Sequence, residues 1–519
     1  EIDKELSKLS LQFGENVLAE TQAYQLHITN ESDLAGLPEG TIEAARSLAK
    51  SQEKEGWIFT LDYPSYVPFV TYADNRELRK KMAIAFGAKG FQNNEFDNQE
   101  IVLKIAKLRF DRAQVLGYAT HAHFVLEERM AESPEKVKTF SNDLLEKAKP
   151  AALKEFAQLT AFAKELHGIE QLEKWDGAYY SEKLKQQLFN LDDEILKPYF
   201  QLEKVLDGAI AITKKLFGIT FEEIFDVDKY HEEVKTYAVK DEEDQLVAVF
   251  YADFFPRKGK RNGAWMTSFK SQYIKKGINE RPHISIVCNF TKPTETKPSL
   301  LTFNEVTTLF HEFGHALHGM LANTTYPSLS GTSVYWDFVE LPSQILENWC
   351  YEPEALALFA YHYETGEMIP MELVHKIKES ASFQEGIATM RQLSFGLLDM
   401  GWHAQDPSNI KDIKAFETEQ FAATQLYPEV KENAMSTSFS HIFQGGYSSG
   451  YYSYKWAEVL DADAFEYFQE CGIFNKEVAT KFKENVLSKG GTEHPMILYK
   501  RFRGQEPKPE ALLRRAGLL

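Results

Sequence analysis

Two histidines and a glutamate in the segment HEFGHALH, residues 311 to 318, have the spacing of a metal site that carries out hydrolysis. On an α-helix, side chains four residues apart lie on the same face, so His311 and His315 can bind one metal ion together. Glu312 then lies beside the ion, where a carboxylate can act as a base. The pattern predicts a zinc-dependent hydrolase of peptides.

The residues around this motif have the pattern of an amphipathic helix. Thr302 and Glu305 have the spacing of a capping box, which starts a helix. Apolar residues then recur at helical spacing, and both histidines project almost opposite this apolar stripe. His318 lies on the histidine face, about 10 Å along the axis from the first histidine, and we expect it to pack or to support a ligand. The alternative is a helix whose histidines are only hydrogen-bonded in a core.

A hydrolytic zinc site usually has three protein ligands and leaves the fourth position to water. The next carboxylates lie in YWDFVELPSQILENW and are Asp337, Glu340 and Glu347. Glu340 and Glu347 are seven residues apart, so on a helix they would share a face, as a ligand and a carboxylate that orients a ligating histidine would. Spacing alone leaves the choice between them open. Pro342 indicates that a helix begins close to Glu340.

A second group of polar aromatic residues lies in SHIFQGGYSSGYYSYKW, residues 440 to 456. Its glycines permit a flexible loop, and its tyrosines supply phenol donors that stay protonated near neutral pH. Such donors suit the developing oxyanion of a tetrahedral intermediate. The alternative is an aromatic loop that only packs.

HEFGHALH followed by FVELPSQILENW resembles the thimet oligopeptidase (M3) family of zinc metallopeptidases. Within that family, the chain resembles most closely the bacterial peptidyl-dipeptidases, also called dipeptidyl carboxypeptidases. The resemblance runs from about Tyr72, through GAWM at 263–266 and NFTKP at 289–293, to the end of the chain.

The resemblance implies a role for each residue of the first motif. His311, His315 and Glu340 would bind one zinc ion, and Glu312 would be the catalytic acid and base. It also implies a large zincin-like fold with a deep substrate cleft.

The same resemblance assigns substrate contacts to the second segment. In the family, a histidine and two tyrosines of this segment contact substrate, and they correspond to His441, Tyr447 and Tyr454. The expected reaction is attack by metal-activated water, with a tyrosine helping to hold the oxyanion.

The cleavage mode depends on how the end of a substrate is bound. Release of a C-terminal dipeptide requires a cation near the free carboxylate, and the candidates are Lys455, Arg501 and Arg503. The residues alone do not choose between dipeptide release and internal cleavage. Overall resemblance favours release of C-terminal dipeptides, with an oligopeptidase-like endopeptidase as the alternative.

A function of another class is a non-catalytic helical scaffold that binds peptides and uses a structural metal. Structural zinc sites usually fill all four positions with protein ligands, often cysteine, and the motif contains no cysteine. The motif therefore favours a catalytic site.

Length and composition describe the setting. A chain of 519 residues exceeds what one hydrophobic core usually organises, so we expect two lobes with a cleft between them. The net charge of −19 argues against nucleic acid as a partner, and we expect a monomer that acts on short unstructured peptides.

Cysteine usage and hydropathy indicate the compartment. The three cysteines are scattered, which favours a reducing compartment and hence the cytoplasm. No apolar run is long enough to cross a membrane. Because the family usually has a further helical portion upstream, we expect residues 1–70 to be the truncated remainder of an N-terminal helical segment and 71–519 to be the catalytic region. A lost export signal would make the periplasm the alternative location.

The periodicity along the chain predicts a mainly α fold. Helical spacing covers residues 74–91, 95–131, 134–167, 190–217, 369–400 and 475–487. Between about 233 and 291, the runs EEVKTYAV, LVAVFYADFF and HISIVCNF predict a small sheet just before the zinc helix. An exposed edge strand there would suit an extended peptide, although the sheet could instead only support the helix.

Overall fold

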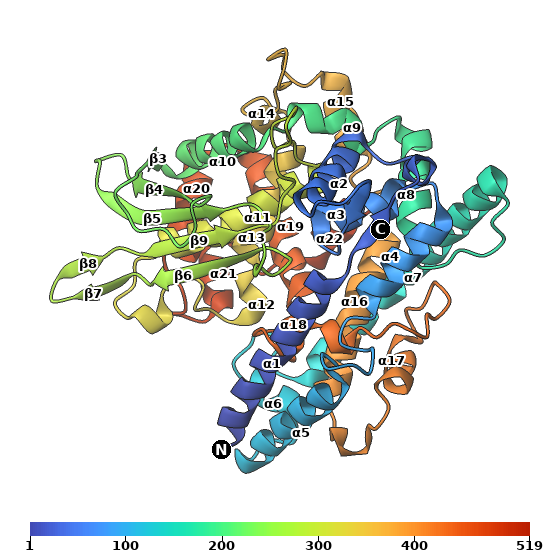
Figure 1. Ribbon diagram of the computed structural model, residues 1–519. Helices are drawn as coiled ribbons and strands as arrows, with labels where there is room; N and C mark the ends of the chain where they lie inside the picture. Colours follow the sequence, from blue (N-terminus) through green and yellow to red (C-terminus); the bar gives the residue numbers. More distant parts are fainter. Residues whose placement is uncertain (519) are drawn as a thin grey trace. The chain divides into compact units, whose positions relative to one another are not determined.

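The computed structural model describes residues 1–518, and they are mainly helical, with a small β-sheet (Figure 1). These residues form two compact units that interleave along the chain. The first unit comprises 1–188 and 383–455, and the second comprises 189–382 and 456–517. The predicted mainly α class with a small sheet is confirmed. The predicted division at residue 70 and the deep cleft stay predictions.

Helices dominate the first unit, with one short antiparallel pair of strands. The helices are α1 (Ile2–Ala23), α2 (Glu39–Ser51), α3 (Tyr63–Tyr72), α4 (Arg76–Gly87), α5 (Gln99–Val115), α6 (His121–Leu126), α7 (Pro134–His167), α8 (Gly177–Phe189), α16 (Glu385–His403), α17 (Ile413–Phe421) and α18 (Ser440–Phe443), and the strands are β1 (Leu26–Ile28) and β2 (Trp57–Phe59). The long helix α7 has the predicted bounds, because Ser133 caps its first turn and Gly168 ends it in the left-handed conformation. It packs along α16 (Figure 1).

Residues 440–456, the tyrosine segment, are supported by a core of the first unit. This core joins α1, α5, α16 and α18. Its large members include Phe13, Trp402 and Phe443, which are buried and in contact through their rings. Tyr447 and Tyr454 pack against this cluster. The tyrosine segment is thus attached to a packed core.

The second unit contains a five-stranded sheet with the order β3-β4-β5-β9-β6 and a separate β7–β8 pair. The strands are β3 (Thr220–Glu223), β4 (Lys235–Lys240), β5 (Leu246–Asp253), β6 (Trp265–Lys270), β7 (Tyr273–Lys275), β8 (Ile278–Glu280) and β9 (His283–Val287). Strands β5 and β9 are parallel, and the other neighbours in the sheet are antiparallel. The three predicted strands correspond to β4, β5 and β9.

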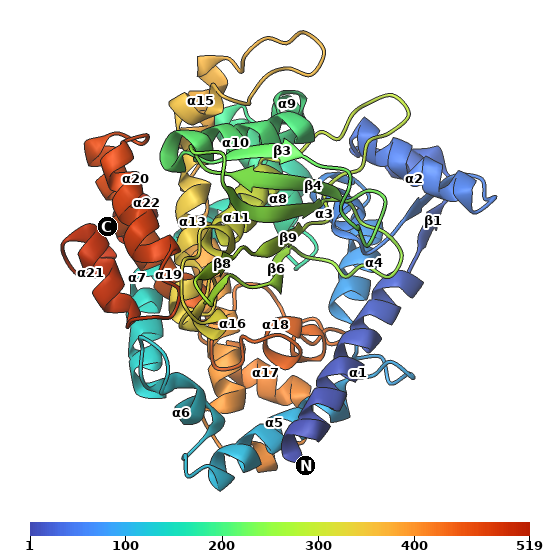
Figure 2. The same ribbon diagram turned by 90° about the vertical axis from the view of Figure 1, so that its left-hand side faces the viewer.

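The sequence did not predict β3 and β6, which form the two edges of the sheet. Edge strands need no apolar alternation, and β3 reads TFEE with mostly exposed side chains. Helix α11 (Phe303–Met320) packs on β5, β6 and β9 (Figure 2). The Phe250 and Phe313 rings meet there at a centroid distance of 5.5 Å.

The second unit contains further helices besides α11. They are α9 (Asp193–Leu196), α10 (Leu202–Phe217), α12 (Trp336–Val339), α13 (Leu341–Glu347), α14 (Pro353–Leu356), α15 (Met371–Glu379), most of α19 (Ser453–Cys471), α20 (Lys476–Phe482), α21 (Pro495–Arg503) and α22 (Pro509–Arg515). Of these helices, α10 and α13 contact α11. In residues 1–518, every helix is too short or too polar to cross a membrane.

Candidate active site

Helix α11 carries the predicted metal-binding motif. The predicted capping box is confirmed: Thr302 Oγ1 accepts from the Glu305 amide at 3.1 Å, and a Glu305 carboxylate oxygen accepts from the Thr302 amide at 3.0 Å. The apolar face of the helix is buried, whereas the side chains of His311 and His315 keep 20% and 12% exposure. The helix therefore buries one side and leaves both imidazoles accessible.

A close approach between α11 and α13 brings Glu340 to these histidines. Gly314 lies between the two histidines, and a Cβ atom added to it would lie 2.2 Å from the Pro342 carbonyl oxygen. Only glycine permits the backbones to come so close. Glu340 is the residue directly before α13, so this contact fixes its position.

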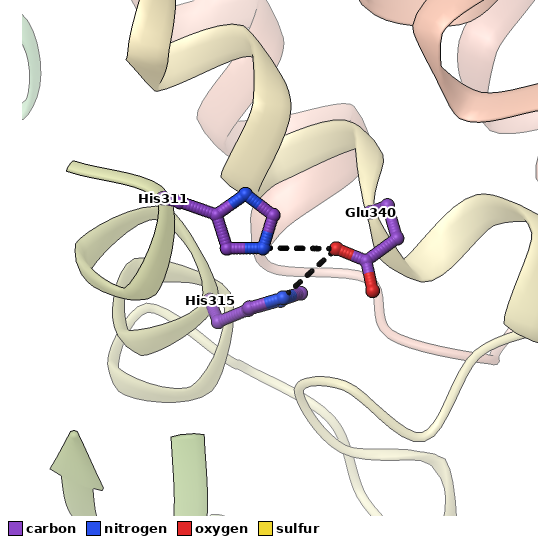
Figure 3. Close-up of side chains that lie close together, drawn as sticks. All are labelled: His311, His315 and Glu340. Atoms are coloured by element: carbon purple, nitrogen blue, oxygen red, sulfur yellow. Dashed lines mark ion pairs between the residues drawn. The ribbon is translucent and has the colours of Figure 1, made fainter. Parts of the chain in front are cut away.

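The three predicted metal ligands lie together (Figure 3). Glu340 Oε2 lies 3.2 Å from His311 Nε2 and 3.0 Å from His315 Nε2, and one ligand atom from each residue lies within 4.8 Å of the others. Ser343 Oγ donates to Glu340 Oε2 at 2.9 Å, a contact that the sequence did not predict. Burial alone would raise the pKa of Glu340, but His315 and His311 hold that pKa well below its usual range. The carboxylate is thus kept in its ligand form.

Glu347 contacts the other nitrogen of the first histidine. His311 Nδ1 lies 2.6 Å from Glu347 Oε1, so Nδ1–H donates to the carboxylate and Nε2 is left to bind a metal. Spacing did not decide which carboxylate has which role. In the structure, Glu340 lies where a ligand is expected, and Glu347 contacts His311 as an orienting carboxylate would. Asp337 is fully buried in α12 and is not a member of the cluster.

The cluster fits zinc. Two imidazole nitrogens and one carboxylate oxygen form a common hydrolytic ligand set. At metal–ligand distances of roughly 2.0–2.1 Å, ligands of a tetrahedral ion are separated by roughly 3.3 Å, which is close to the observed nitrogen–oxygen distances of 3.0 and 3.2 Å.

Glu312 is buried beside the cluster. Its Oε2 has no hydrogen-bond partner within the described chain, and the side chain is 4% exposed. Burial raises the pKa of Glu312 above its ordinary value, although His311 and His315 oppose this shift. A carboxylate with a raised pKa and an unused oxygen has the properties of a general base.

His318 is fully buried, and neither ring nitrogen has a hydrogen-bond partner among residues 1–518. Burial lowers the pKa of His318 to about 3, so the ring is neutral. Its place agrees with the packing role that the sequence predicted.

The second predicted group, His441, Tyr447 and Tyr454, lies in the first unit. Tyr447 and Tyr454 stack with a centroid distance of 5.2 Å and an interplanar angle of 7°. The His441 ring lies 5.8 Å from Tyr447 and 6.2 Å from Tyr454. His441 is exposed and both tyrosines are partly exposed, so the three side chains form an accessible aromatic cluster.

Sequence reasoning missed the groups that support this cluster. Asp399 accepts hydrogen bonds from the backbone amides of Ser449 and Tyr451. The sequence signal is a pair of polar residues, Asp399 and His403, one turn apart in the mostly apolar second half of the helix.

Comparisons with known proteins point to one family. The family model described as Peptidase family M3 matches residues 69–518. Oligopeptidase A of Salmonella typhimurium (strain LT2) is 45% identical over 525 residues, which cover 100% of this chain and 77% of that protein. Dipeptidyl carboxypeptidase of Escherichia coli (strain K12) is 35% identical over 522 residues, which cover 100% and 76%.

Among solved structures, PZ peptidase A has a similar fold, with a TM-score of 0.57 and 16% sequence identity over 98% of this chain and 74% of that chain. The predicted family resemblance is confirmed. The chain belongs to peptidase family M3, a family of metallopeptidases.

Proposed function

We propose that this chain hydrolyses short, unstructured peptides with one zinc ion bound by His311, His315 and Glu340. The observation that supports this most directly is the cluster of two imidazole nitrogens and one carboxylate oxygen, with an unused Glu312 oxygen buried beside it. A structural site would normally offer a fourth protein ligand.

The zinc ion and the side chains would have different roles in the reaction. When bound, zinc supplies Lewis acidity that activates water and polarises the scissile carbonyl. Glu312 takes the proton of the attacking water and passes it to the leaving amine. Glu347 keeps His311 in the tautomer that binds metal through Nε2.

We assign substrate contacts to the aromatic cluster of His441, Tyr447 and Tyr454. Tyr447 and Tyr454 are phenol donors for the developing oxyanion, and His441 contacts the peptide. Their accessibility and their mutual stacking support this assignment.

Strand β6 provides a place for an extended peptide. It is the last strand of its sheet and pairs on one side with β9. A peptide added as a further strand would be held by main-chain hydrogen bonds, which tolerate many sequences.

On the cleavage mode, we favour internal cleavage over dipeptide release. Of the cations that sequence analysis considered for a free carboxylate, Arg501 pairs with Glu493 at 2.8 Å and Arg503 with Asp463 at 3.3 Å. Lys455 lies 3.6 Å from a carboxylate oxygen of Glu385. Each of them is already next to an acid. The higher identity to an oligopeptidase A also supports this choice, whereas the 35% identical dipeptidyl carboxypeptidase keeps dipeptide release as the second candidate.

The setting is proposed from the sequence alone. We propose a monomeric protein of the cytoplasm, with the periplasm as the alternative location, whose acidic surface does not bind nucleic acid.

One set of assays tests the proposal. The zinc-loaded wild type and Glu312→Gln are incubated with a quenched short peptide, and zinc content is measured for both. The variant should keep its zinc and lose turnover by about a hundredfold to ten-thousandfold. Binding of peptide without cleavage by either protein would favour the non-catalytic scaffold.

Mass spectrometry of products distinguishes the two cleavage modes. Internal cleavage should proceed on both a free and a C-terminally amidated peptide. Stepwise loss of two residues from the free peptide alone would instead identify dipeptide release.

A further inference from the structure

A buried carboxylate holds the backbone of the tyrosine segment. Asp399 lies in α16 and is fully buried. Its Oδ1 accepts a hydrogen bond from the Ser449 amide at 2.8 Å, and its Oδ2 accepts from the Tyr451 amide at 2.9 Å. Both oxygens of one charged group are therefore used on the short stretch between Tyr447 and Tyr454.

A neutral histidine connects this carboxylate to an arginine. His403 Nδ1 lies 2.8 Å from Asp399 Oδ1, and Arg109 Nη1 lies 2.9 Å from His403 Nε2. Arginine can only donate, so Nε2 must accept and Nδ1–H must donate to the carboxylate. Burial lowers the pKa of His403, which agrees with a neutral ring in this position. The His403 ring thus fixes the orientation of Asp399 relative to Arg109.

Two further contacts hold the same segment. Arg109 Nη1 donates to the Ile442 carbonyl oxygen at 2.6 Å, next to His441. His121 Nε2 lies 3.0 Å from Ser448 Oγ, and its ring lies 5.0 Å from the His403 ring. The segment is therefore held at four points by groups from three helices, α5, α6 and α16.

This arrangement is more than the packing of the core requires. The apolar cluster already joins α5, α16 and α18, whereas burying an arginine and an aspartate is costly unless every hydrogen bond is made. The segment also needs support, because it is rich in glycine and because Ser449 has a φ of 56°, in the left-handed region. The amide of this same residue donates to Asp399.

We propose that Asp399, oriented by His403 and Arg109, is a positioning residue that holds the tyrosine segment in the conformation in which Tyr447 and Tyr454 act on the substrate. This inference rests on the proposed function, since it takes the two phenols as the groups being positioned. Asp399 itself touches neither zinc ligands nor substrate in this proposal.

The test compares Asp399→Asn with wild type in the zinc-loaded full chain. The amide keeps the size of the side chain but offers one acceptor oxygen instead of two and carries no charge. Hydrogen exchange followed by mass spectrometry reports on residues 445–452, and steady-state kinetics on a quenched peptide reports kcat and KM. Asp176→Asn is the matched control, because Asp176 is also a fully buried aspartate of the first unit, paired with Arg76 and Arg79.

The expected result is specific to the segment. In Asp399→Asn, exchange at 445–452 should become at least about tenfold faster, and kcat should fall about tenfold to hundredfold with KM changed less than about threefold. Asp176→Asn should lose thermal stability without either effect. Ser448→Ala, which removes one neutral hydrogen bond to His121 and leaves no unpaired charge, should shift both readouts in the same direction by a smaller factor and serves if Asp399→Asn does not fold.

Several results would overturn the inference. One is unchanged exchange at 445–452 in Asp399→Asn, and another is faster exchange with unchanged kcat. Equal losses of kcat in Asp399→Asn and Asp176→Asn would also contradict it, because they would reflect general destabilisation. Failure of the proposed function is separately visible: Glu312→Gln would then cleave as fast as wild type, while the exchange data would still decide whether Asp399 holds the segment.

Discussion

Substitution of Gly314 by alanine should weaken zinc binding although glycine is not a ligand. Gly314 lies on α11 between the two histidines of the cluster, at the point where α11 meets α13. The added Cβ would lie 2.2 Å from the Pro342 carbonyl oxygen and 2.6 Å from Ser343 Cα. Both contacts are with backbone, so no side chain can rotate to relieve them.

The size of the effect follows from these distances. Ordinary contact would require α13 to move by about 1 Å, whereas metal–ligand distances tolerate about 0.2 Å. Forced overpacking costs typically about 1–3 kcal/mol. If the protein relieves that strain by moving Glu340 away from the histidines, the same energy corresponds to zinc binding weakened about fivefold to 150-fold.

The assay is competition for zinc between the protein and a coloured chelator at fixed pH. Gly319→Ala is the matched control on the same helix, because the atoms nearest to its added Cβ belong to the side chains of Ile284 and Met266, at 2.7 and 3.2 Å, and not to backbone. It should change thermal stability and keep wild-type zinc affinity. Wild-type zinc affinity in Gly314→Ala would refute the argument that backbone approach fixes the third ligand.

Three further predictions concern other parts of the molecule. Glu347→Ala should weaken zinc binding about tenfold to hundredfold in the same competition assay, because a ligating imidazole loses its orienting acceptor. Tyr447→Phe should lower kcat about a hundredfold to thousandfold with little change in KM, measured by steady-state kinetics; an unchanged kcat would remove it from the oxyanion role. Asp253 is buried, and although burial opposes it, contacts with Arg257 and Lys260 hold its pKa below the ordinary value. The contribution of Asp253 to stability is therefore present above the unfolded pKa and is lost as pH falls through the lower folded pKa. The melting temperature of Asp253→Asn should therefore fall less than that of wild type between about pH 5 and pH 2.

The sequence predicted the helix that carries HEFGHALH well because every signal for it is local. The capping box, the apolar stripe and the paired histidines all lie within one segment of eighteen residues and its cap. Helical periodicity also located α7, and the β-branched and aromatic runs located the three strands β4, β5 and β9. The stretch 95–131, predicted as one helical region, is divided into α5 and α6. Edge strands were missed because their side chains are not sorted by burial.

Spacing could not choose between Glu340 and Glu347 because it assumed one continuous helix. In the structure Glu340 lies at the junction of α12 and α13, with φ −82° and ψ −7°, and Glu347 is the last residue of α13. The two carboxylates therefore approach different nitrogens of His311. The interruption of the helix at Glu340 decides which nitrogen each carboxylate approaches, and periodicity contains no information about such an interruption.

The groups that support the tyrosine segment were missed for a different reason, which is distance along the chain. Asp399 is 50 residues from Ser449, and Arg109 is 294 residues from His403. In both units a buried or half-buried carboxylate outside the recognisable motif fixes the orientation of the groups that we assign to chemistry. Under the proposed function, a chain with an intact HEFGHALH segment but without Glu347 or Asp399 should therefore still match the motif and turn over slowly.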